Sequence, residues 1–329
     1  MQATATFVKA TRAFFIVAGS TVIGAPAIAQ SYPVKPVRWI VPLPPGGSTD
    51  LISRMIAQKL TDAWRVQVVV DNRSGAAGTI GLAMAAKSPP DGYTIVLVQT
   101  GNVAIAPGLY PRLAYDPVKD LAPVTQVLST PMILVAHPSL LARSVRELVA
   151  LARAKPGTIT YASGGNGGQV HLAFAMLATM AGMQMVHVPY KGVGPALIDL
   201  IGGQVAISFT SIPPSMPLIK AGKLKALGVS SARRFKSLPE VPTIAEDGVA
   251  GYEVSVWYGV MVPAGTPREI IVRINADIVR ILAQPDVQER FSGEGGAMVA
   301  GTPEAFGTYI RAEIVRWTKV ISETGVKVD

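Results

Sequence analysis

Residues 37–60 read VRWIVPLPPGGSTDLISRMIAQKL, and this stretch decides the fold class. The β-rich run Val37 to Val41 leads into a turn with two glycines, and a helical pattern begins near Thr49. The apolar face of that helix consists of Leu51, Ile52, Met55, Ile56 and Leu60. A helix patterned in this way lies against a sheet. The order of strand, glycine turn and helix therefore predicts an α/β fold.

The same alternation of β-rich and helical segments continues along the chain. A strand is expected at Val66 to Val70, a helix near Ile80 to Lys87 and a strand at Thr94 to Gln99. A second series of β-rich runs follows at Met132 to Ala136, Ile159 to Ala162, Val186 to Val188, Val205 to Phe209 and Ala226 to Val229. Such alternation predicts parallel sheets with crossover helices.

Two amphipathic helices near the C-terminus each need a sheet to cover. Their apolar positions are Ile270, Ile271, Ile274, Ile278 and Ile281 in one, and Phe306, Ile310, Ile314, Trp317 and Ile321 in the other. If the run Val256 to Val262 returns to the first series, the chain forms two α/β lobes joined by two hinge segments. We then expect lobe 1 at residues 30–130 and 254–329, lobe 2 at residues 131–253, and hinges at about 128–132 and 250–257.

The first residues have the three-part pattern of a secretory signal peptide. Lys9 and Arg12 precede the apolar run Ala13 to Gly24, and the small-residue tripeptide Ala27-Ile28-Ala29 follows. An uncleaved anchoring helix is less favoured, because the run is shorter than the ~20 residues that a membrane span needs. We expect cleavage near Ala29-Gln30 and a mature protein in the periplasm.

The composition excludes several classes of function. The 329 residues include no cysteine and three histidines, which excludes disulfides and thiolate chemistry and leaves little material for a histidine metal centre. The net charge is +9, but the longest basic run is Arg233-Arg234 and aromatic residues make up 6%, so no nucleic-acid partner is expected. A positive field favours capture of anionic ligands.

Two glycine-rich turns each follow an expected strand and precede an expected helix. The first reads Pro44-Pro45-Gly46-Gly47-Ser48-Thr49-Asp50, and the second reads Ser163-Gly164-Gly165-Asn166-Gly167-Gly168. Glycine brings main-chain N–H groups close to a ligand, and a helix N-terminus adds partial positive charge. Both turns therefore predict binding of an anion such as a carboxylate.

Other functions fit these turns less well. Neither turn has the Walker pattern or a GxGxxG motif followed by an acidic residue about twenty positions on, so no nucleotide cofactor is expected. Ser163 with His171 suggests an exported serine hydrolase, but Gly-x-Ser-x-Gly is absent and sequence spacing does not establish a hydrogen bond. The hydrolase stays open as an alternative, as does a purely structural role for the glycines.

Polar residues at other strand ends are further candidate ligand contacts, because open α/β sheets bind ligands at the carboxyl ends of their strands. They are Thr100, Asn102, Tyr190, Thr210 and Ser211. Asp50, in the first helical turn, fits the helix dipole or contact with a ligand ammonium group. His171 fits packing or a ligand contact, and Trp257 and Tyr258 fit ligand stacking or hinge packing.

Ordered motifs extend from residue 44 to residue 267. They are Pro44 to Asp50, Pro90 to Thr94, Tyr115-Asp116-Pro117, Tyr161 to Gly164, His171-Leu172-Ala173, His187 to Gly192, Gly202 to Val205, Ile219 to Leu224, Leu238 to Thr243, Trp257-Tyr258-Gly259 and Pro263 to Pro267. With these motifs the mature chain resembles, over nearly its full length, the Bug-type substrate-binding proteins of tripartite tricarboxylate transporters.

The resemblance implies a type II-like periplasmic binding protein whose two Rossmann-like lobes close around a small organic acid and deliver it to an inner-membrane permease. It also implies that main-chain N–H groups, hydroxyls and waters at the two glycine turns hold the carboxylate. Carried onto this chain, the contacts are Pro45, Gly46, Gly47 and Ser48 from one lobe and Ser163, Gly164, Asn166 and Gly167 from the other. We expect a monomer with no enzymatic activity, no cofactor and no metal.

The sequence departs from the family pattern around the second turn. Phe174-Ala175 stands where the family commonly has Gly-Glu, Gly168 stands where serine is usual, and Ala206 replaces an acid. Because polar or acidic positions are apolar or bare here, we expect a less polar carboxylate that bears an aromatic or alkyl part. A sensor that presents its ligand to a membrane protein, without a permease, is an alternative.

Overall fold

The computed structural model describes residues 1–2, 32–235, 238–293 and 296–328. The chain divides into two units, Met1–Tyr32 and Pro33–Asp329. The predicted signal peptide falls almost wholly on residues 3–31, which lie outside the described residues. All elements below belong to the second unit. In the described part of the chain, no helix is both long enough and apolar enough to cross a bilayer.

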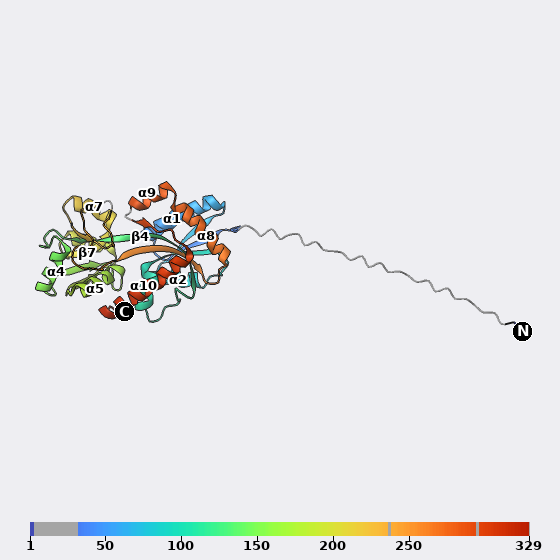
Figure 1. The fold of residues 1–329 in the computed structure, drawn as a ribbon, viewed down its shortest axis with the longest axis horizontal. Helices are drawn as coiled ribbons and strands as arrows, with labels where there is room; N and C mark the ends of the chain where they lie inside the picture. Colours follow the sequence, from blue (N-terminus) through green and yellow to red (C-terminus); the bar gives the residue numbers. More distant parts are fainter. Residues whose placement is uncertain (3–31, 236–237, 294–295, 329) are drawn as a thin grey trace. The chain divides into compact units, whose positions relative to one another are not determined.

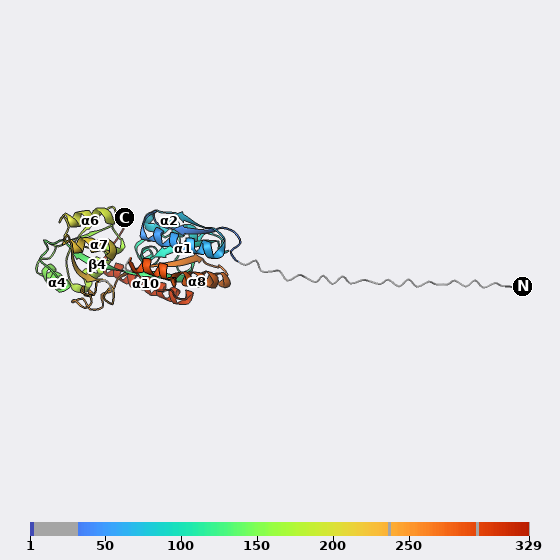
Figure 2. The same cartoon turned by 90° about the horizontal axis from the view of Figure 1, so that it is seen from above.

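The strands join in one sheet whose main path runs β2-β1-β3-β9-β4-β7-β5-β6, with β8 and β10 paired to β4. We call the end that contains β1 lobe 1 and the end that contains β5 lobe 2 (Figures 1 and 2). Lobe 1 holds β1 (Val37–Val41), β2 (Val68–Asn72), β3 (Thr94–Gln99), β9 (Ser255–Pro263) and β10 (Ala297–Met298). Lobe 2 holds β5 (Thr160–Ser163), β6 (Val186–Pro189), β7 (Ile207–Ser211) and β8 (Lys225–Val229), and β4 (Leu121–Ala136) belongs to both.

Helices surround the sheet at both ends. Lobe 1 carries α1 (Ser48–Trp64), a short helix at Ala76–Gly78, α2 (Thr79–Ala86), a π-helix at Gly101–Ile105, α3 (Ala106–Leu109), α8 (Arg268–Leu282), α9 (Pro285–Gly293) and α10 (Pro303–Thr324). Lobe 2 carries α4 (Val145–Ala154), α5 (Gln169–Ala181), α6 (Val193–Ile201) and α7 (Ile212–Lys220). Both C-terminal helices that needed a sheet lie on lobe 1, where α8 and α10 contact β4. The α/β class expected from the sequence is confirmed.

Helix α1 shows how local sequence sets an element's ends. Gly47 caps the helix in an extended conformation, and Arg65 ends it in the left-handed region with φ 57°. Ile52, Ile56 and Leu60 are buried against the sheet, as the apolar pattern predicts. Leu51 was placed on the same face, and here the prediction is wrong: its side chain is 40% exposed. It is the first apolar residue of the helix, and it lines a pocket that is described below.

The sheet is mixed, whereas the alternation predicted parallel sheets. Strand β1 pairs in parallel with β2 and β3, and β5 pairs in parallel with β6 and β7. Strand β9, however, lies antiparallel between β3 and β4. The segment expected at Val256 to Val262 therefore does return to the first series. A strand has the same alternation of side chains whether its neighbour is parallel or antiparallel, and only the pattern of hydrogen bonds differs. The sequence pattern therefore could not reveal that β9 is antiparallel.

Strand β4 is much longer than the predicted strand at Met132 to Ala136. It begins at Leu121 and runs for 16 residues, despite Pro123 and Pro131. The ladder to β9 shifts register just after Pro123, and such irregularities accommodate a residue without an N–H donor. The first part of β4 pairs with β9 and the last part with β7 and β8, so one strand runs through both lobes (Figure 1).

The predicted hinge at 128–132 lies within β4, and the one at 250–257 overlaps the first residues of β9. Residues 129–131 of β4 pair with residues 255–257 of β9, so the two connections lie side by side. The lobe boundaries at 130/131 and 253/254 stay a prediction, as does hinge motion. Trp257 was left between ligand stacking and hinge packing. It is fully buried and packs edge-on against Phe306, while its Nε1 donates to Glu313 at 3.0 Å.

Candidate functional site

The first glycine turn connects β1 to α1 and is exposed from Pro44 to Ser48. Gly46 has φ 87°, a left-handed backbone conformation in which a side chain is strained. An added Cβ at Gly46 or Gly47 would meet nothing within 4 Å, so both residues border open space. The turn therefore presents main-chain atoms, rather than side chains, to a neighbouring molecule.

The buried carboxylate of Asp50 holds this turn in place through hydrogen bonds. Its carboxylate accepts hydrogen bonds from the Gly46 N–H at 3.0 Å, from Arg54 Nε at 2.9 Å and from Asn72 Nδ2 at 3.0 Å. Burial raises the pKa of Asp50, but the bonds from Arg54, Gly46 and Asn72 outweigh it, so the pKa lies below the ordinary value. Asn72 Nδ2 also donates to the Leu43 carbonyl. Asp50 thus uses its oxygens to hold the turn in shape.

The N-terminus of α1 opens at this turn. Gly47 makes no side-chain capping bond, and the Asp50 and Leu51 N–H groups both donate to the Gly47 carbonyl. The N–H groups of Ser48 and Thr49 come earlier in the helix, where no intrahelical acceptor exists. With the helix dipole, they make this end of a 17-residue helix attractive to an anion.

The second glycine turn follows β5 and carries a serine–histidine contact. Ser163 Oγ lies 2.6 Å from His187 Nε2 and 3.0 Å from the Gly165 carbonyl, and it accepts from the Gly165 N–H at 3.2 Å. The Ser163 side chain is 1% exposed. The buried hydroxyl of Ser163 therefore stabilises the turn through its hydrogen bonds to Gly165. The hydrolase alternative paired Ser163 with His171, and the hydrogen-bonded partner is instead His187.

His171 and His187 form a stacked pair beneath the turn. Their ring centroids lie 3.8 Å apart, and Tyr161 stacks on His187 at 4.9 Å. His171 Nδ1 accepts from the Gly167 N–H at 3.1 Å. Burial lowers the pKa of His171, and burial together with the neighbouring His171 lowers the pKa of His187 to about 4. Both rings are therefore neutral near pH 7 and can accept the hydrogen bonds that hold the turn.

His187 is a site residue that the sequence did not predict. It lies on β6, directly opposite Tyr161 on β5. The contact between Ser163 and His187 could be expected only if β5 and β6 were known to be neighbours in the sheet.

Four further predicted contacts have their side chains engaged within the protein. Thr100 and Asn102 are fully buried, and Thr100 Oγ1 accepts from the Trp257 N–H at 2.9 Å. Asn102 Oδ1 accepts from the Gln99 N–H at 3.0 Å, whereas its buried Nδ2 has no hydrogen-bond partner among the described residues. Thr210 shares a 2.5 Å hydrogen bond with a buried serine hydroxyl. Tyr190 donates to Asp199 at 2.7 Å, and burial followed by this carboxylate raises the tyrosine pKa to about 12.

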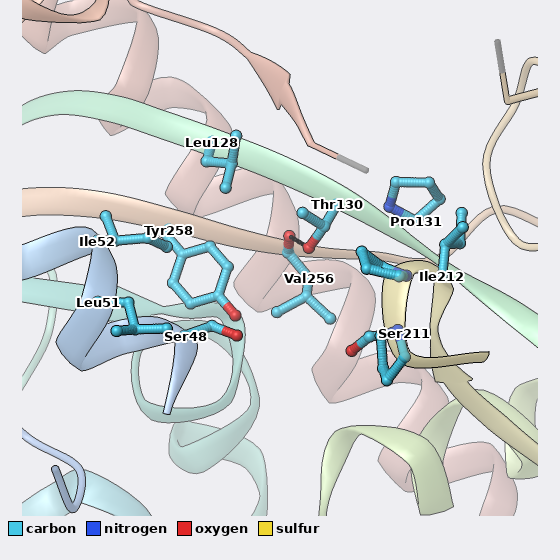
Figure 3. Close-up of a pocket in the computed structure, with 12 residues that line it drawn as sticks. Ser48, Leu51, Ile52, Leu128, Thr130, Pro131, Ser211, Ile212, Val256 and Tyr258 are labelled. Carbon is cyan, nitrogen blue, oxygen red and sulfur yellow. Dashed lines mark hydrogen bonds between the residues drawn. The ribbon is translucent and has the colours of Figure 1, made fainter. Parts of the chain in front are cut away.

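A pocket of about 260 Å³ lies where the two lobes meet, and we call it the hinge-side pocket (Figure 3). Lobe 1 supplies residues of α1 and β9, lobe 2 supplies the β7–α7 junction, and β4 runs behind them. Its lining residues are Ser48, Leu51, Ile52, Leu128, Thr130, Pro131, Ser211, Ile212, Pro213, Pro214, Val256 and Tyr258. Two of the predicted contacts, Ser48 and Ser211, therefore face one pocket from opposite lobes.

A second pocket of about 240 Å³ borders the second glycine turn, and we call it the turn-side pocket. Its lining residues are Leu43, Ala77, Gln99, Gly101, Ile105, Ala106, Leu109, Tyr110 and residues 164–169. It receives three predicted contacts, Gly164, Asn166 and Gly167. The remaining predicted residues line neither pocket, namely Pro45, Gly46, Gly47, Asp50, Thr100, Asn102, Ser163, His171, Tyr190 and Thr210.

Most of the apolar residues that line the pockets are not predictable from sequence. Leu51 belongs to the apolar face of its helix, and single apolar residues such as Ile212 and Leu109 carry no functional signal. Tyr258, left open between two roles, lines the hinge-side pocket. As for metals, no group of three or more histidine or acidic residues in the described ranges is arranged to hold an ion.

Comparison with known proteins identifies relatives along almost the whole chain. A family model described as "Tripartite tricarboxylate transporter family receptor" matches residues 52–326. The protein BugT of Bordetella pertussis is 40% identical over 306 residues, which cover 93% of this chain and 94% of BugT.

Two solved structures extend the similarity to the fold. The Rhodopseudomonas palustris protein Rpa4515, solved with adipate, has a TM-score of 0.80 and 36% identity, covering 90% of this chain and 99% of that one. MatC of the same organism, solved with bound malate, has a TM-score of 0.76 and 30% identity, covering 88% and 100%. The family match, over residues 52–326, includes segments of both lobes and the second glycine turn.

Proposed function

The chain belongs to the tripartite tricarboxylate transporter receptor family, and we propose that it captures a small organic carboxylate in the cleft between its lobes and delivers it to a membrane permease. Membership makes the protein a solute-binding receptor rather than an enzyme. The relatives solved with adipate and malate support a carboxylate as the ligand class.

One observation carries the proposal: a pocket whose wall comes from both lobes begins at the open N-terminus of α1. Ser48 is the first residue of that helix and Ser211 immediately precedes α7. A ligand bound to both serines would touch both lobes, so binding would favour the closed arrangement of a hinged molecule.

We assign the carboxylate contacts to the two glycine turns. Pro45, Gly46, Gly47 and Ser48 would contribute from lobe 1, and Ser163, Gly164, Asn166 and Gly167 from lobe 2. Of these, Ser163 would act by shaping its turn, because its hydroxyl is buried. The two turns border different pockets, so a ligand that contacts both requires the lobes to move about the strands β4 and β9.

Location and partners follow from the same proposal. The protein would be exported by a signal peptide cleaved near Ala29-Gln30, act as a monomer in the periplasm and dock on an inner-membrane permease. Crosslinking in intact cells, followed by identification of the membrane partner, separates this from a receptor that presents its ligand to a sensor.

The primary test is a ligand screen by melting temperature. The purified protein is unfolded and refolded to remove carried-over ligand, then heated with a panel of carboxylates, amino acids and sugars. A ligand at ~100 times its Kd stabilises by about 2.7 kcal/mol, which is several degrees for a protein of this size. Stabilisation by organic acids, and not by sugars, is expected. A shift with sugars and with no compound that carries a carboxylate would refute the proposal.

A further inference from the structure

Resting on the proposed function, we infer that the ligand is a carboxylate joined to an apolar body, and that this body packs in the hinge-side pocket against Leu51 and Ile212. The anionic group would lie at the serine end of the pocket, by the first turn of α1. The pocket thereby selects among carboxylates by the apolar part of the molecule.

The lining of the hinge-side pocket has no charged side chain. Its twelve residues are apolar or carry an uncharged hydroxyl, and two consecutive prolines at the start of α7 remove main-chain N–H donors from its lobe 2 wall. A second carboxylate placed in this pocket would lose its hydration without gaining an ionic or N–H partner, which is costly. The lining therefore opposes a short hydrophilic dicarboxylate.

The apolar residues of the pocket come from both lobes. Leu51 extends from α1 with 40% of its surface exposed, although it heads the helix's apolar face. Ile212 lies across the pocket and Val256 lies between the two sides (Figure 3), and Leu128 and the two prolines complete the apolar lining. An apolar group inserted here would cover Leu51 and remove apolar surface from water on both sides.

The polar side-chain atoms of the pocket are four hydroxyls, which belong to Ser48, Thr130, Ser211 and Tyr258. The hydroxyls of Ser48 and Ser211 point toward the space between the lobes (Figure 3). Ser211 makes no capping bond to α7, so its hydroxyl is not engaged at that helix. The Thr130 hydroxyl, by contrast, donates to the Val256 carbonyl at 3.1 Å. One carboxylate can therefore bind beside Ser48 and Ser211 while the rest of the ligand packs against the apolar side chains of the pocket.

The volume sets the size of that apolar body. An engineered cavity of about 150 Å³ lined by apolar side chains holds benzene. The hinge-side pocket, at about 260 Å³, has room for a ring with a substituent or a chain of comparable volume. Malate fills only part of this space and brings a second charge to it.

Calorimetric titration with a homologous series tests the inference. Acetate, butyrate, hexanoate, benzoate and malate are each titrated into refolded, ligand-free protein. Burying one methylene contributes enough free energy for about a fourfold gain in affinity, so affinity should rise from acetate to hexanoate, and hexanoate and benzoate should exceed malate. Leu51→Asn should flatten this rise. Leu141→Asn, at a leucine that is 82% exposed and lines neither pocket, should leave it unchanged.

The outcomes separate the inference from the proposed function. Tighter binding of malate than of hexanoate, or equal affinity along the series, overturns the apolar-body inference and leaves carboxylate capture intact. Binding of none of the acids, with other solute classes bound, overturns both. A rise that survives Leu51→Asn with the fold intact by circular dichroism overturns the assignment to the hinge-side pocket.

Discussion

Replacing Asp50 with asparagine should loosen the first glycine turn, and the structure allows the effect to be sized. The carboxylate accepts from the Gly46 N–H, from Arg54 and from Asn72, all at about 3 Å. An asparagine keeps one acceptor oxygen and turns an NH₂ group toward at least one of these donors. At least one donor must then lose its partner.

The magnitude follows from where each donor lies. Arg54 is half exposed and returns to water, so its ion pair with Asp50 contributes about 0.5 kcal/mol. The Gly46 and Asn72 bonds involve a carboxylate whose side chain is 4% exposed, and loss of one such bond costs about 1.5–3 kcal/mol. We expect Asp50→Asn to lower the free energy of unfolding by about 2–3 kcal/mol.

Ligand affinity should fall as well, because the ligand would have to order a turn that is loose in the variant. If about 1 kcal/mol of the lost unfolding free energy also reduces the free energy of binding, affinity drops about fivefold. The assay is urea unfolding for stability and calorimetry for affinity, at pH 7 and fixed salt. The matched control is Asp62→Asn, an exposed carboxylate on the same helix that accepts one bond from Gln58. Unchanged affinity in a destabilised Asp50→Asn protein would refute a positioning role and leave only a structural one.

Acid should produce the same effect without mutation. The pKa of Asp50 lies below its ordinary value of 3.8 in the folded protein. The contribution of ionised Asp50 to the free energy of unfolding is therefore fully present above pH 3.8. It is lost as the pH falls through the lower pKa that Asp50 has in the folded protein. Urea midpoints measured below pH 4 should fall more steeply in the wild type than in Asp50→Asn, and parallel curves would contradict this.

Three other changes test the packing around the site. Gly259→Ala should destabilise by about 1–3 kcal/mol, because the new Cβ would lie 2.1 Å from the Phe306 ring; an unchanged urea midpoint would show that the ring moves aside freely. Glu313→Leu should cost about 2–5 kcal/mol, since it leaves two buried tryptophan N–H groups unpaired, and a smaller loss in chemical denaturation would count against that hydrogen-bond network. His187, with a folded pKa of about 4 against an ordinary 6.5, favours the folded state fully above pH 6.5 and progressively less as pH falls to 4. Wild-type stability should therefore decline over that interval and decline less in His187→Gln; equal slopes would exclude His187 as the cause.

Local sequence predicted most helices and strands, and β4 shows where it failed. The sequence predicted only the short strand that begins at Met132. In the structure the strand begins at Leu121 and continues through Pro123 and Pro131, because it pairs with β9 along this length, with a shift of register after Pro123. Propensity describes a residue by itself, whereas a strand is stabilised by its partners.

The candidate site likewise contains residues that local sequence identifies and residues that only tertiary contacts bring into the site. Gly46, Ser48 and Ser163 were identified from the sequence because a glycine turn between a strand and a helix is a local signal. Leu51 and His187 gained their roles only through neighbours from other parts of the chain. Periodicity gives the face of a helix on which Leu51 lies, but it does not show which segments of the chain leave a pocket beside that face.

The sequence by itself therefore determined the α/β class, the two glycine turns and the family, because each depends on residues close together along the chain or on ordered motifs. Tertiary structure alone decided the strand order, the passage of β4 through both lobes, the contact of Ser163 with His187 and the pocket that Ser48 and Ser211 share. These features join residues that are distant in sequence, and a pocket is the space left when such segments pack together.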